Sequence, residues 1–422
     1  MSRIAYAAML ENGGNQMIVN GVKGKKYDFI CEYQFSPNSK TLVHTAEEGD
    51  EAFVVINGRE GPRYGAVLHV VISPDSKRVA YTTRGPNGLV VDGRWFGPYR
   101  FVEFESMVFS PDSKHFVYAA DSADEKNACR LYLDGKEIDR CEELHLFSVR
   151  FTPDSGSLAY VYQKGGEWFV RFGATRYGPF EDADGVKMTI SNDSKRSAFG
   201  VQHGKDWFLL CGDKKFGPYA WSPTPLFSPD SKHLAHVGGP RNKATVFLDG
   251  KPLGVYSGVG AWSFTPDSRH LAWIAEDGKK STLVIDGAHA GDDVVEFQFS
   301  PDGKRLARII RVKDIEYVEE AGQRGKAYKH VRSVSFSPDS RHLAYWASRG
   351  NDAVLVVDGL ETFRFEGEIL SSGFRANGTI CGAGVMAPSG DENKFAQPAN
   401  VKELKSVFEK RRLFLFEMAE AD

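Results

Sequence analysis

Short apolar runs that alternate with polar residues recur along almost the whole chain. In one typical period, residues 107–110 and 115–119 form two such runs, residues 131–133 form a third, and a fourth follows the next turn. Alternation with a period of two residues is typical of half-buried β-strands. Helical periodicity is absent until the C-terminal tail, so the pattern predicts an all-β protein in which each period supplies four short strands.

A phrase consisting of an aromatic residue, Ser-Pro-Asp-Ser and then Lys or Arg lies between the first two runs of each period. It recurs every 35 to 42 residues. Proline presets its own φ angle and an Asp side chain bonds its own backbone, so the phrase predicts a tight turn. Its prolines are Pro37, Pro74, Pro111, Pro153, Pro229, Pro266, Pro301 and Pro338, with Asn192 in one copy and a degenerate copy at residues 374–378.

A second turn lies at a fixed position in the same period, and it is usually Asn-Gly or Asp-Gly. These dipeptides favour type I′ hairpin turns, because both central residues of such a turn need a positive φ angle. Two constant turns and four strands per period of about 40 residues predict the blade of a β-propeller. The dipeptides begin at Asn20, Asn57, Asp92, Asp134, Asp249, Asp286 and Asp358.

The phrase at residues 109–114, repeated at 227–232 and 336–341, resembles the WD-like propeller repeat of the TolB type. The resemblance covers roughly residues 3–385 and implies a propeller, but it implies no activity because the phrase is a structural turn. The family's usual Asp-Gly-Lys ending is more often Asp-Ser-Lys or Asp-Ser-Arg here. An added Gly-Pro-Tyr element, as at residues 97–99, suggests a separate branch.

The turns indicate about ten four-stranded blades. The first period lacks its first strand, and a segment at Phe374 could supply it, so that N- and C-terminal strands share the closing blade. Propellers usually have four to eight blades, so two tandem five-bladed propellers are the alternative. No linker marks a boundary near the middle, which favours one continuous ring.

The composition changes after residue 386, so we divide the chain into a repeat domain, residues 1–386, and a tail, residues 387–422. Apolar residues between 401 and 418 have a spacing compatible with a short amphipathic helix, while residues 413–416 could equally form a strand. A tail packed on the propeller is favoured over a partner-binding or membrane-surface segment.

Charge and cysteine content narrow the class of partner and the compartment. The formal net charge is −3, which provides no global field to hold nucleic acid or an anionic membrane. The five cysteines form no CxxC pair, and Cys129 and Cys141 flank a predicted hairpin as packed thiols, although a disulfide is conceivable in an exported protein. The apolar stretch at the N-terminus is too short and too interrupted for the core of a signal peptide, and no apolar stretch is long enough to span a membrane. We expect a cytoplasmic protein, or a periplasmic one if a leader was removed.

No nucleophile elbow, phosphate-binding loop, dinucleotide fingerprint or zinc-protease motif occurs, so we assign no catalytic residue, no metal site and no cofactor. The peptidases that share this repeat carry their nucleophile in a separate domain, for which the chain has no room. Four histidines recur at one position of the repeat, but they open strands in different blades and cannot share an ion. They are His115, His233, His270 and His342.

The connections between the second and third strands, and between one blade and the next, differ in every copy. Loops carry function while constant turns carry fold, so these connections are the predicted binding face. Aromatic and acidic residues in or beside them suit a protein hot spot or a carbohydrate platform, or else they are blade-packing residues and a solvated rim. The candidate binding residues are Trp168, Trp207, Trp221, Trp262, Asp182, Asp184, Asp292 and Asp293.

The sequence therefore favours a non-enzymatic propeller scaffold that binds a protein or peptide partner on its variable loops. The alternative is a carbohydrate-acting lyase or hydrolase that uses the same carboxylates. A third hypothesis is a structural module whose tail drives assembly; the oligomeric state is left open.

Overall fold

The computed structural model describes residues 5–10, 13–20, 22–122, 129–145, 147–350, 352–374, 380–386, 401–408 and 411–418. In these ranges the chain consists of β-strands and turns, with no helix, and its strands form ten antiparallel sheets, most of them four-stranded. The predicted all-β fold, a β-propeller of about ten four-stranded blades, is confirmed. The chain folds as two compact units, residues 1–30 with 260–422 (unit 1) and residues 31–259 (unit 2).

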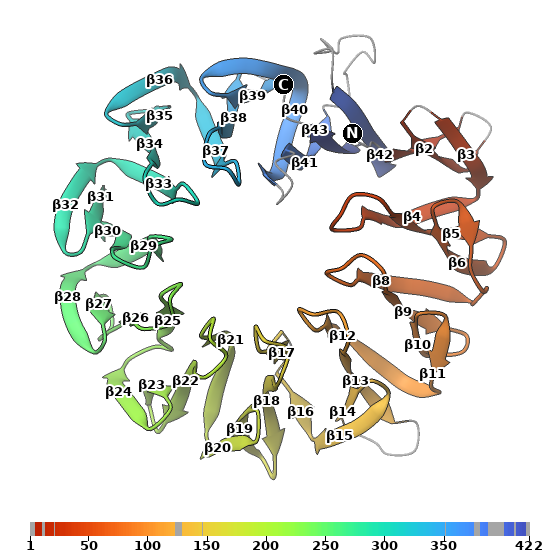
Figure 1. Cartoon of the computed structure of the whole chain (residues 1–422), viewed down its shortest axis with the longest axis horizontal. Coiled ribbons are helices and arrows are strands. Elements are labelled where there is room, and N and C mark those ends of the chain that lie inside the picture. The colour runs from red at the N-terminus through yellow and green to blue at the C-terminus, as the bar shows by residue number, and fades with distance from the viewer. Residues whose placement is uncertain are drawn as a thin grey trace. The chain divides into compact units, whose positions relative to one another are not determined.

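Unit 2 contains six sheets, which follow one another in chain order from orange to green in Figure 1. Their strands, sheet by sheet, are β4 (Phe29–Phe35), β5 (Leu42–Glu48), β6 (Glu51–Ile56) and β7 (Arg59–Glu60); β8 (Ala66–Ile72), β9 (Val79–Arg84), β10 (Gly88–Val91) and β11 (Arg94–Phe96); β12 (Tyr99–Phe109), β13 (Phe116–Ser122), β14 (Cys129–Leu133) and β15 (Lys136–Cys141); β16 (Glu143–Leu144), β17 (Arg150–Phe151), β18 (Leu158–Lys164), β19 (Glu167–Phe172) and β20 (Thr175–Phe180); β21 (Asp182–Ile190), β22 (Ser197–His203), β23 (Asp206–Cys211) and β24 (Lys214–Tyr219); β25 (Thr224–Phe227), β26 (Leu234–Gly238), β27 (Ala244–Leu248) and β28 (Lys251–Tyr256).

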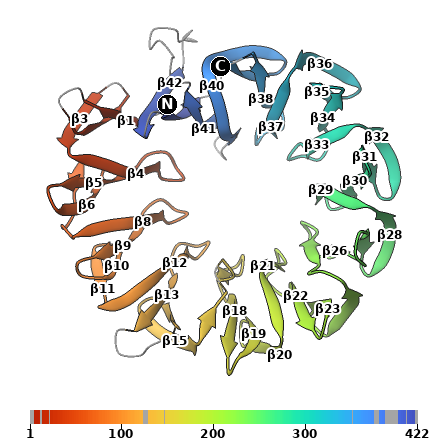
Figure 2. The same cartoon turned by 180° about the vertical axis from the view of Figure 1, so that it is seen from behind.

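Unit 1 contains the remaining four sheets of the described residues, one of which is extended to seven strands (Figure 2). Their strands are β1 (Ala5–Met9), β2 (Asn15–Val19) and β3 (Val22–Tyr27); β29 (Gly258–Phe264), β30 (Leu271–Asp277), β31 (Lys280–Ile285) and β32 (Ala288–Asp292); β33 (Val294–Phe299), β34 (Leu306–Val312), β35 (Ile315–Glu320) and β36 (Gln323–Tyr328); β37 (His330–Phe336), β38 (Leu343–Arg349), β39 (Asp352–Val357), β40 (Leu360–Phe374), β41 (Ile380–Met386), β43 (Arg411–Met418) and β42 (Val401–Phe408).

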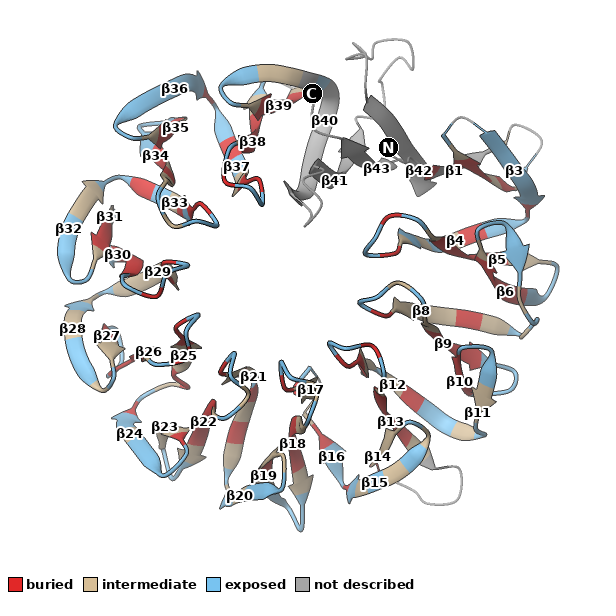
Figure 3. Ribbon diagram, viewed as in Figure 1, coloured by how far each residue is buried: buried red, intermediate tan, exposed pale blue. Residues whose placement is uncertain are grey.

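The hydrophobic core lies between neighbouring sheets rather than within any one of them. Val117 and Leu131 of one sheet pack in a single cluster with Tyr160 and Tyr162 of the next. Figure 3 shows the buried residues concentrated in second and third strands such as β22, while fourth strands such as β24 are largely exposed. Each blade therefore depends on its neighbours for stability, because one sheet cannot bury both of its faces alone.

The Asp-Gly turns have the predicted geometry. In one of them Asp134 has φ 53° and Gly135 has φ 79°, as a type I′ turn requires. The Asp134 carboxylate has a second role, because its Oδ1 atom accepts the N–H of Phe116 at 2.9 Å. The turn between the third and fourth strands is thereby tied to the start of the second strand.

The Ser-Pro-Asp phrase forms a loop closed by its own side chains. Ser110 Oγ donates to Asp112 Oδ1 at 2.6 Å and accepts the N–H of His115 at 2.9 Å, and the same Asp112 oxygen accepts the N–H of Lys114 at 3.1 Å. The hydrogen bond from Ser110, followed by the backbone one from Lys114, lowers the pKa of Asp112 to about 2. The fourth residue of the phrase, Ser113, has a left-handed φ of 64°.

Ser113 also explains why the usual glycine is replaced by serine. Its Oγ atom accepts the N–H of Asp75, in the corresponding loop of the preceding sheet, at 2.9 Å. A glycine would adopt the same φ angle more easily but could not accept this bond. The same bond joins Asn38 to Ser76, Asp112 to Ser155, Asp154 to Ser194, Asp193 to Ser231 and, in unit 1, Asp302 to Ser340.

We call this series the inter-blade ladder, and it is continuous through unit 2. The bond from Asp154 to Ser194, 2.9 Å long, joins the fifth sheet of the chain to the sixth. Two tandem five-bladed propellers would require an interruption at that point. The ladder therefore favours a single series of blades.

The four repeated histidines are paired within their own sheets. His115 Nδ1 lies 2.7 Å from Asp134 Oδ2, and His233 Nδ1 lies 2.8 Å from Asp249 Oδ2. Corresponding contacts join His270 to Asp286 at 2.5 Å and His342 to Asp358 at 2.6 Å. These histidines connect the two constant turns of each sheet, and their structural role is evident.

The chain ends differ from the prediction. The first sheet has three strands, as expected, but Phe374 does not lie beside it. Phe374 is the last residue of β40, which pairs with β39 and with β41, and β42 is the strand that lies beside β1. The residues after Phe374 in the degenerate repeat copy, 375–379, lie outside the described residues. That N- and C-terminal strands share a closing blade stays a prediction.

Residues 401–408 and 411–418 form strands rather than a helix. β43 pairs with β41, whose edge would otherwise leave backbone groups unpaired, and β42 pairs with β43. Of the two alternatives for this segment, the helix is wrong. The boundary of the repeat domain at residue 386 stays a prediction, and residues 387–400 lie outside the described part. Among the described residues there is no helix that is long and apolar enough to span a membrane.

Candidate functional site

The two ends of each sheet differ in character. Because the strands are antiparallel, the Ser-Pro-Asp loop and the Asp-Gly turn lie at one end, which we call the turn end. The connections between second and third strands, and those leading to the next sheet, lie at the opposite end, which we call the loop end. The bond between His115 and Asp134 joins the two constant turns and confirms this arrangement.

Two of the four candidate tryptophans pack against the core. Trp168 on β19 and Trp207 on β23 are half-buried and lie against the hydrophobic clusters of their sheets. Trp168 also contacts the ring of His145 edge-on, with the ring centres 6.0 Å apart. Trp221, which follows β24, and Trp262, on β29, are half-buried too. A binding role for these four residues stays a prediction.

The first pair of candidate carboxylates lies on β21. Asp182 Oδ1 accepts the N–H of Ala183 at 2.7 Å, while Asp184 accepts the hydroxyl of Ser222 at 2.7 Å and lies 3.4 Å from Lys187 Nζ. Burial raises the pKa of Asp184, but the bonds from Ser222 and Lys187 outweigh it and the pKa lies below its ordinary value. Asp184 is thus held as an anion that stabilises the bulge in β21.

The second pair lies in unit 1, at the end of β32. Asp292 lies 3.1 Å from His289 Nε2 and 3.2 Å from Lys280 Nζ, and hydrogen bonds from these two residues lower its pKa. Asp293 is exposed and has a φ of 58°, and its carbonyl accepts the N–H of Arg311. The pKa values of Asp184 and Asp292 are lowered, whereas the general acid of a glycosidase needs a raised pKa.

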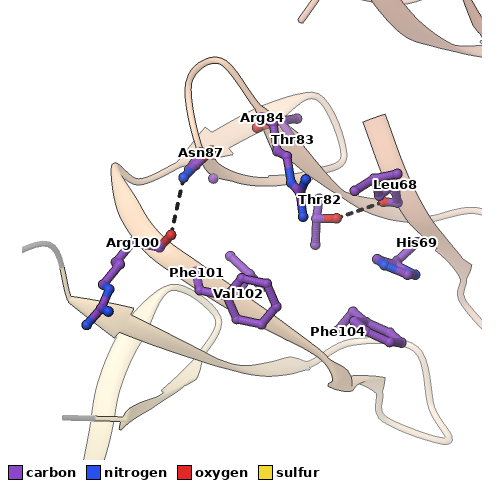
Figure 4. A pocket seen from close by; sticks show the side chains of 11 residues that line it. Leu68, His69, Thr82, Thr83, Arg84, Asn87, Arg100, Phe101, Val102 and Phe104 are labelled. Atoms are coloured by element: carbon purple, nitrogen blue, oxygen red, sulfur yellow. Dashed lines mark hydrogen bonds between the residues drawn. The ribbon is translucent and has the colours of Figure 1, made fainter. Parts of the chain in front are cut away.

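A cavity at the loop end of unit 2 has more distinctive chemistry (Figure 4). It has a volume of about 140 Å³ and lies between the sheet β8–β11 and the strand β12. Two hydrogen bonds connect its two sides. The side-chain amide of Asn87 donates to the carbonyl of Arg100 at 3.2 Å, and the backbone carbonyl of Asn87 accepts the N–H of Tyr99 at 3.1 Å. Its other lining residues are Leu68, His69, Thr82, Thr83, Arg84, Gly88, Phe101, Val102 and Phe104.

Two β-bulges position the aromatic residues of this cavity. His69 has a φ of 52° where the pairing of β8 with β9 shifts register, and Phe104 lies where the pairing of β12 with β13 shifts. The two rings stack with centres 3.6 Å apart and planes 5° apart. Figure 4 shows the ring of Phe101 between this stack and Arg100. Phe101 is 42% exposed and Phe104 is 36% exposed, which is high for phenylalanine.

A second cavity, of about 560 Å³, lies at the loop end of unit 1. Glu361 in its wall accepts the Tyr328 hydroxyl at 3.1 Å and pairs with Lys326 at 3.5 Å and Arg349 at 3.1 Å. Burial raises the pKa of Glu361, but the Tyr328 bond and the two positive charges outweigh it and lower the pKa overall. Glu361 therefore pairs with two of the positive charges of this wall.

Sequence reasoning found the loop that contains Arg84 and Asn87 as one of the variable connections, but it missed the aromatic residues opposite. The available signal was the run Arg100-Phe101-Val102, in which a basic and an aromatic residue lie at the start of a strand and therefore next to the variable loops. The bulges that expose Phe104 and His69 depend on pairing between strands, which the sequence does not reveal. Within the described ranges, no group of three His, Cys, Asp or Glu side chains could hold a metal ion.

Comparison with known proteins adds little beyond the fold. No family model matches the chain, and no curated protein matches it. Among solved structures, a eukaryotic initiation factor is similar at 12% identity, covering 77% of this chain and 98% of that chain, with a TM-score of 0.40. TolB from Acinetobacter baumannii is similar at 14% identity, with 60% and 62% covered and a TM-score of 0.26.

A third similar structure is the Dos1 propeller, at 11% identity, with 72% of this chain and 78% of that chain covered and a TM-score of 0.30. All three TM-scores are below 0.5, so these likenesses carry no argument about function. That the repeat is of the TolB type stays a prediction. The assignment of the chain to the β-propellers rests on its own four-stranded antiparallel sheets.

Proposed function

We propose that the chain is a non-enzymatic β-propeller scaffold that binds a protein or peptide partner at its loop end. One observation carries the proposal: both cavities described above open where variable loops meet, whereas the turn end consists of constant turns occupied by their own hydrogen bonds. Binding residues are typically placed on variable loops that a rigid scaffold supports.

A carbohydrate-acting enzyme has less support. Asp184 and Asp292 are both engaged with a lysine and have lowered pKa values. A glycosidase needs one carboxyl that stays protonated near neutral pH.

The test compares charge reversal at the two ends of the sheets. Lys205→Glu and Lys279→Glu change exposed loop-end residues, and Lys114→Glu and Lys232→Glu are matched changes at the turn end. Each chain is used to capture partners from native lysate, and the captured partner is then purified and its affinity measured. We expect the loop-end pair to weaken binding and the turn-end pair to leave it unchanged. The proposal fails if no stoichiometric partner is captured, or if the turn-end variants alone lose it.

A further inference from the structure

Two arginines that line the unit 2 cavity have no acidic partner in the part of the chain that the structure describes. Arg84 and Arg100 are exposed, and neither makes a side-chain hydrogen bond or ion pair with any described residue. Many other arginines of the chain are neutralised, as Arg63 is by Glu48 at 2.7 Å and Arg78 by Asp92 at 2.7 Å. Positive charge at this cavity is therefore available to a ligand.

The cavity has room for one aromatic ring. Its volume of about 140 Å³ is close to the roughly 150 Å³ of an engineered cavity that holds benzene. The wall offers the ring of Phe101 and the stacked pair of His69 and Phe104, against which an aromatic guest can pack edge-on or offset. A whole metabolite with several rings is too large, whereas a single side chain fits.

The charged side chains that line the ring site are arginines, which can only donate hydrogen bonds. Arg84 and Arg100 both line the cavity, where Asn87 holds the two sheets together. Guanidinium recognises carboxylates through paired hydrogen bonds. A carboxylate next to the bound ring would meet the charge that the protein itself leaves unpaired.

We propose that this cavity is a peptide-binding site for an extended segment that carries an aromatic side chain beside Asp or Glu. The proposal rests on the proposed function and deepens it, since it names the chemistry of the partner. The aromatic ring enters the cavity between Phe101 and the His69–Phe104 pair, and the flanking carboxylates bind Arg84 and Arg100. Single-stranded nucleic acid would offer similar groups, but the net charge of −3 and the room for only one ring favour a peptide.

The experiment selects peptides from a random heptapeptide library displayed on phage, with the full chain as bait. The same selection uses the double variant Arg84→Gln/Arg100→Gln and the variant Phe101→Ala. Arg241→Gln is the matched control, because Arg241 is an exposed arginine in another loop-end connection of unit 2. Circular dichroism and the thermal midpoint show that each variant is folded. One selected peptide is then synthesised and its Kd measured by fluorescence polarisation.

We expect the full chain and Arg241→Gln to select peptides with Phe, Tyr or Trp next to Asp or Glu. The Kd of the chosen peptide should rise at least about tenfold in the double variant, which corresponds to about 1.4 kcal/mol, because the charge-assisted hydrogen bonds to its carboxylate are lost. Peptides that bind equally well to the double variant would overturn the site but leave the proposed function standing. Failure to select any peptide would overturn the site, whereas the proposed function is contradicted only if the capture from lysate also fails. Tighter binding of oligo(dT) than of any selected peptide would also overturn the proposal.

Discussion

Replacement of Ser113 tests the inter-blade ladder directly. Its Oγ atom accepts the Asp75 N–H at 2.9 Å, and its backbone is left-handed with a φ of 64°. Ser113→Ala removes the acceptor and retains the backbone strain, so we expect a loss of about 1 kcal/mol of unfolding free energy, the net contribution of one part-buried hydrogen bond. Ser113→Gly also removes the acceptor but relieves strain of about 1 kcal/mol, so it should be less destabilising than alanine by about that amount.

The assay is urea denaturation of the whole chain, with hydrogen exchange of the Asp75 amide as a local measurement. Ser281→Ala is the matched control, because Ser281 is a half-buried serine whose hydroxyl makes no hydrogen bond with described residues, and we expect it to change stability by less than about 0.5 kcal/mol. The reasoning is refuted if Ser113→Ala has the stability of the wild type while exchange of the Asp75 amide is unchanged. It is also refuted if the glycine variant is the less stable of the two.

Three further predictions follow from the turns and thiols. Gly303 has a φ of 72° and room for a Cβ atom, which would lie 4.0 Å from the amide nitrogen of Asp267. Gly303→Ser should therefore add a ladder bond and slow exchange of the Asp267 amide at little net cost in stability, whereas Gly303→Ala should only destabilise. The pKa of Asp112 is about 2 when folded and 3.8 ordinarily, so its stabilising contribution is present above about pH 4 and is lost as the pH falls toward 2. Asp112→Asn should flatten the pH dependence of unfolding between these values. Cys129 and Cys141 are free, buried and directly opposite in the sheet, and the Cys141 thiol donates to the Cys129 carbonyl at 3.4 Å. The neighbouring Cys141 thiol together with burial raises the pKa of Cys129. Both should react with a thiol reagent only after denaturation, and rapid labelling of the native chain would contradict this packing.

The repeat allowed much of the fold to be predicted. Dipeptides such as Asp134-Gly135 specify their turn locally, and the Ser-Pro-Asp phrase closes its loop with its own side chains. These features depend on residues a few positions apart, so a single sequence contains them. The strand at Phe374 was predicted to lie beside the first sheet, but β42 lies there instead. The assignment was wrong because any strand from the end of the chain could pair with the free edge of that sheet. Competition between distant strands is decided by pairing, which local patterns do not encode.

The candidate site was less accessible to sequence reasoning. The predicted acids were chosen by type and position, but Asp184 and Asp292 each have a lysine partner that only the folded chain reveals. Arg84 and Arg100 are distinctive because no described acidic residue pairs with them, and that property cannot be read from a chain with nearly equal numbers of both charges. The loop end itself was predictable, since its connections vary while the turns stay constant.

The interruption of the ladder at Gly303 has a consequence for how the chain opens. A structure whose repeats bond mainly to their neighbours behaves as a row of coupled elements, and its cooperativity is limited by its weakest joint. Gly303 stands where a serine would join the sheet β29–β32 to the sheet β33–β36, so this pair of sheets lacks the ladder bond. The next pair of sheets has it, because Ser340 accepts the Asp302 N–H. Partial unfolding should therefore start between these two sheets, and protease cleavage under native conditions should concentrate in their loops.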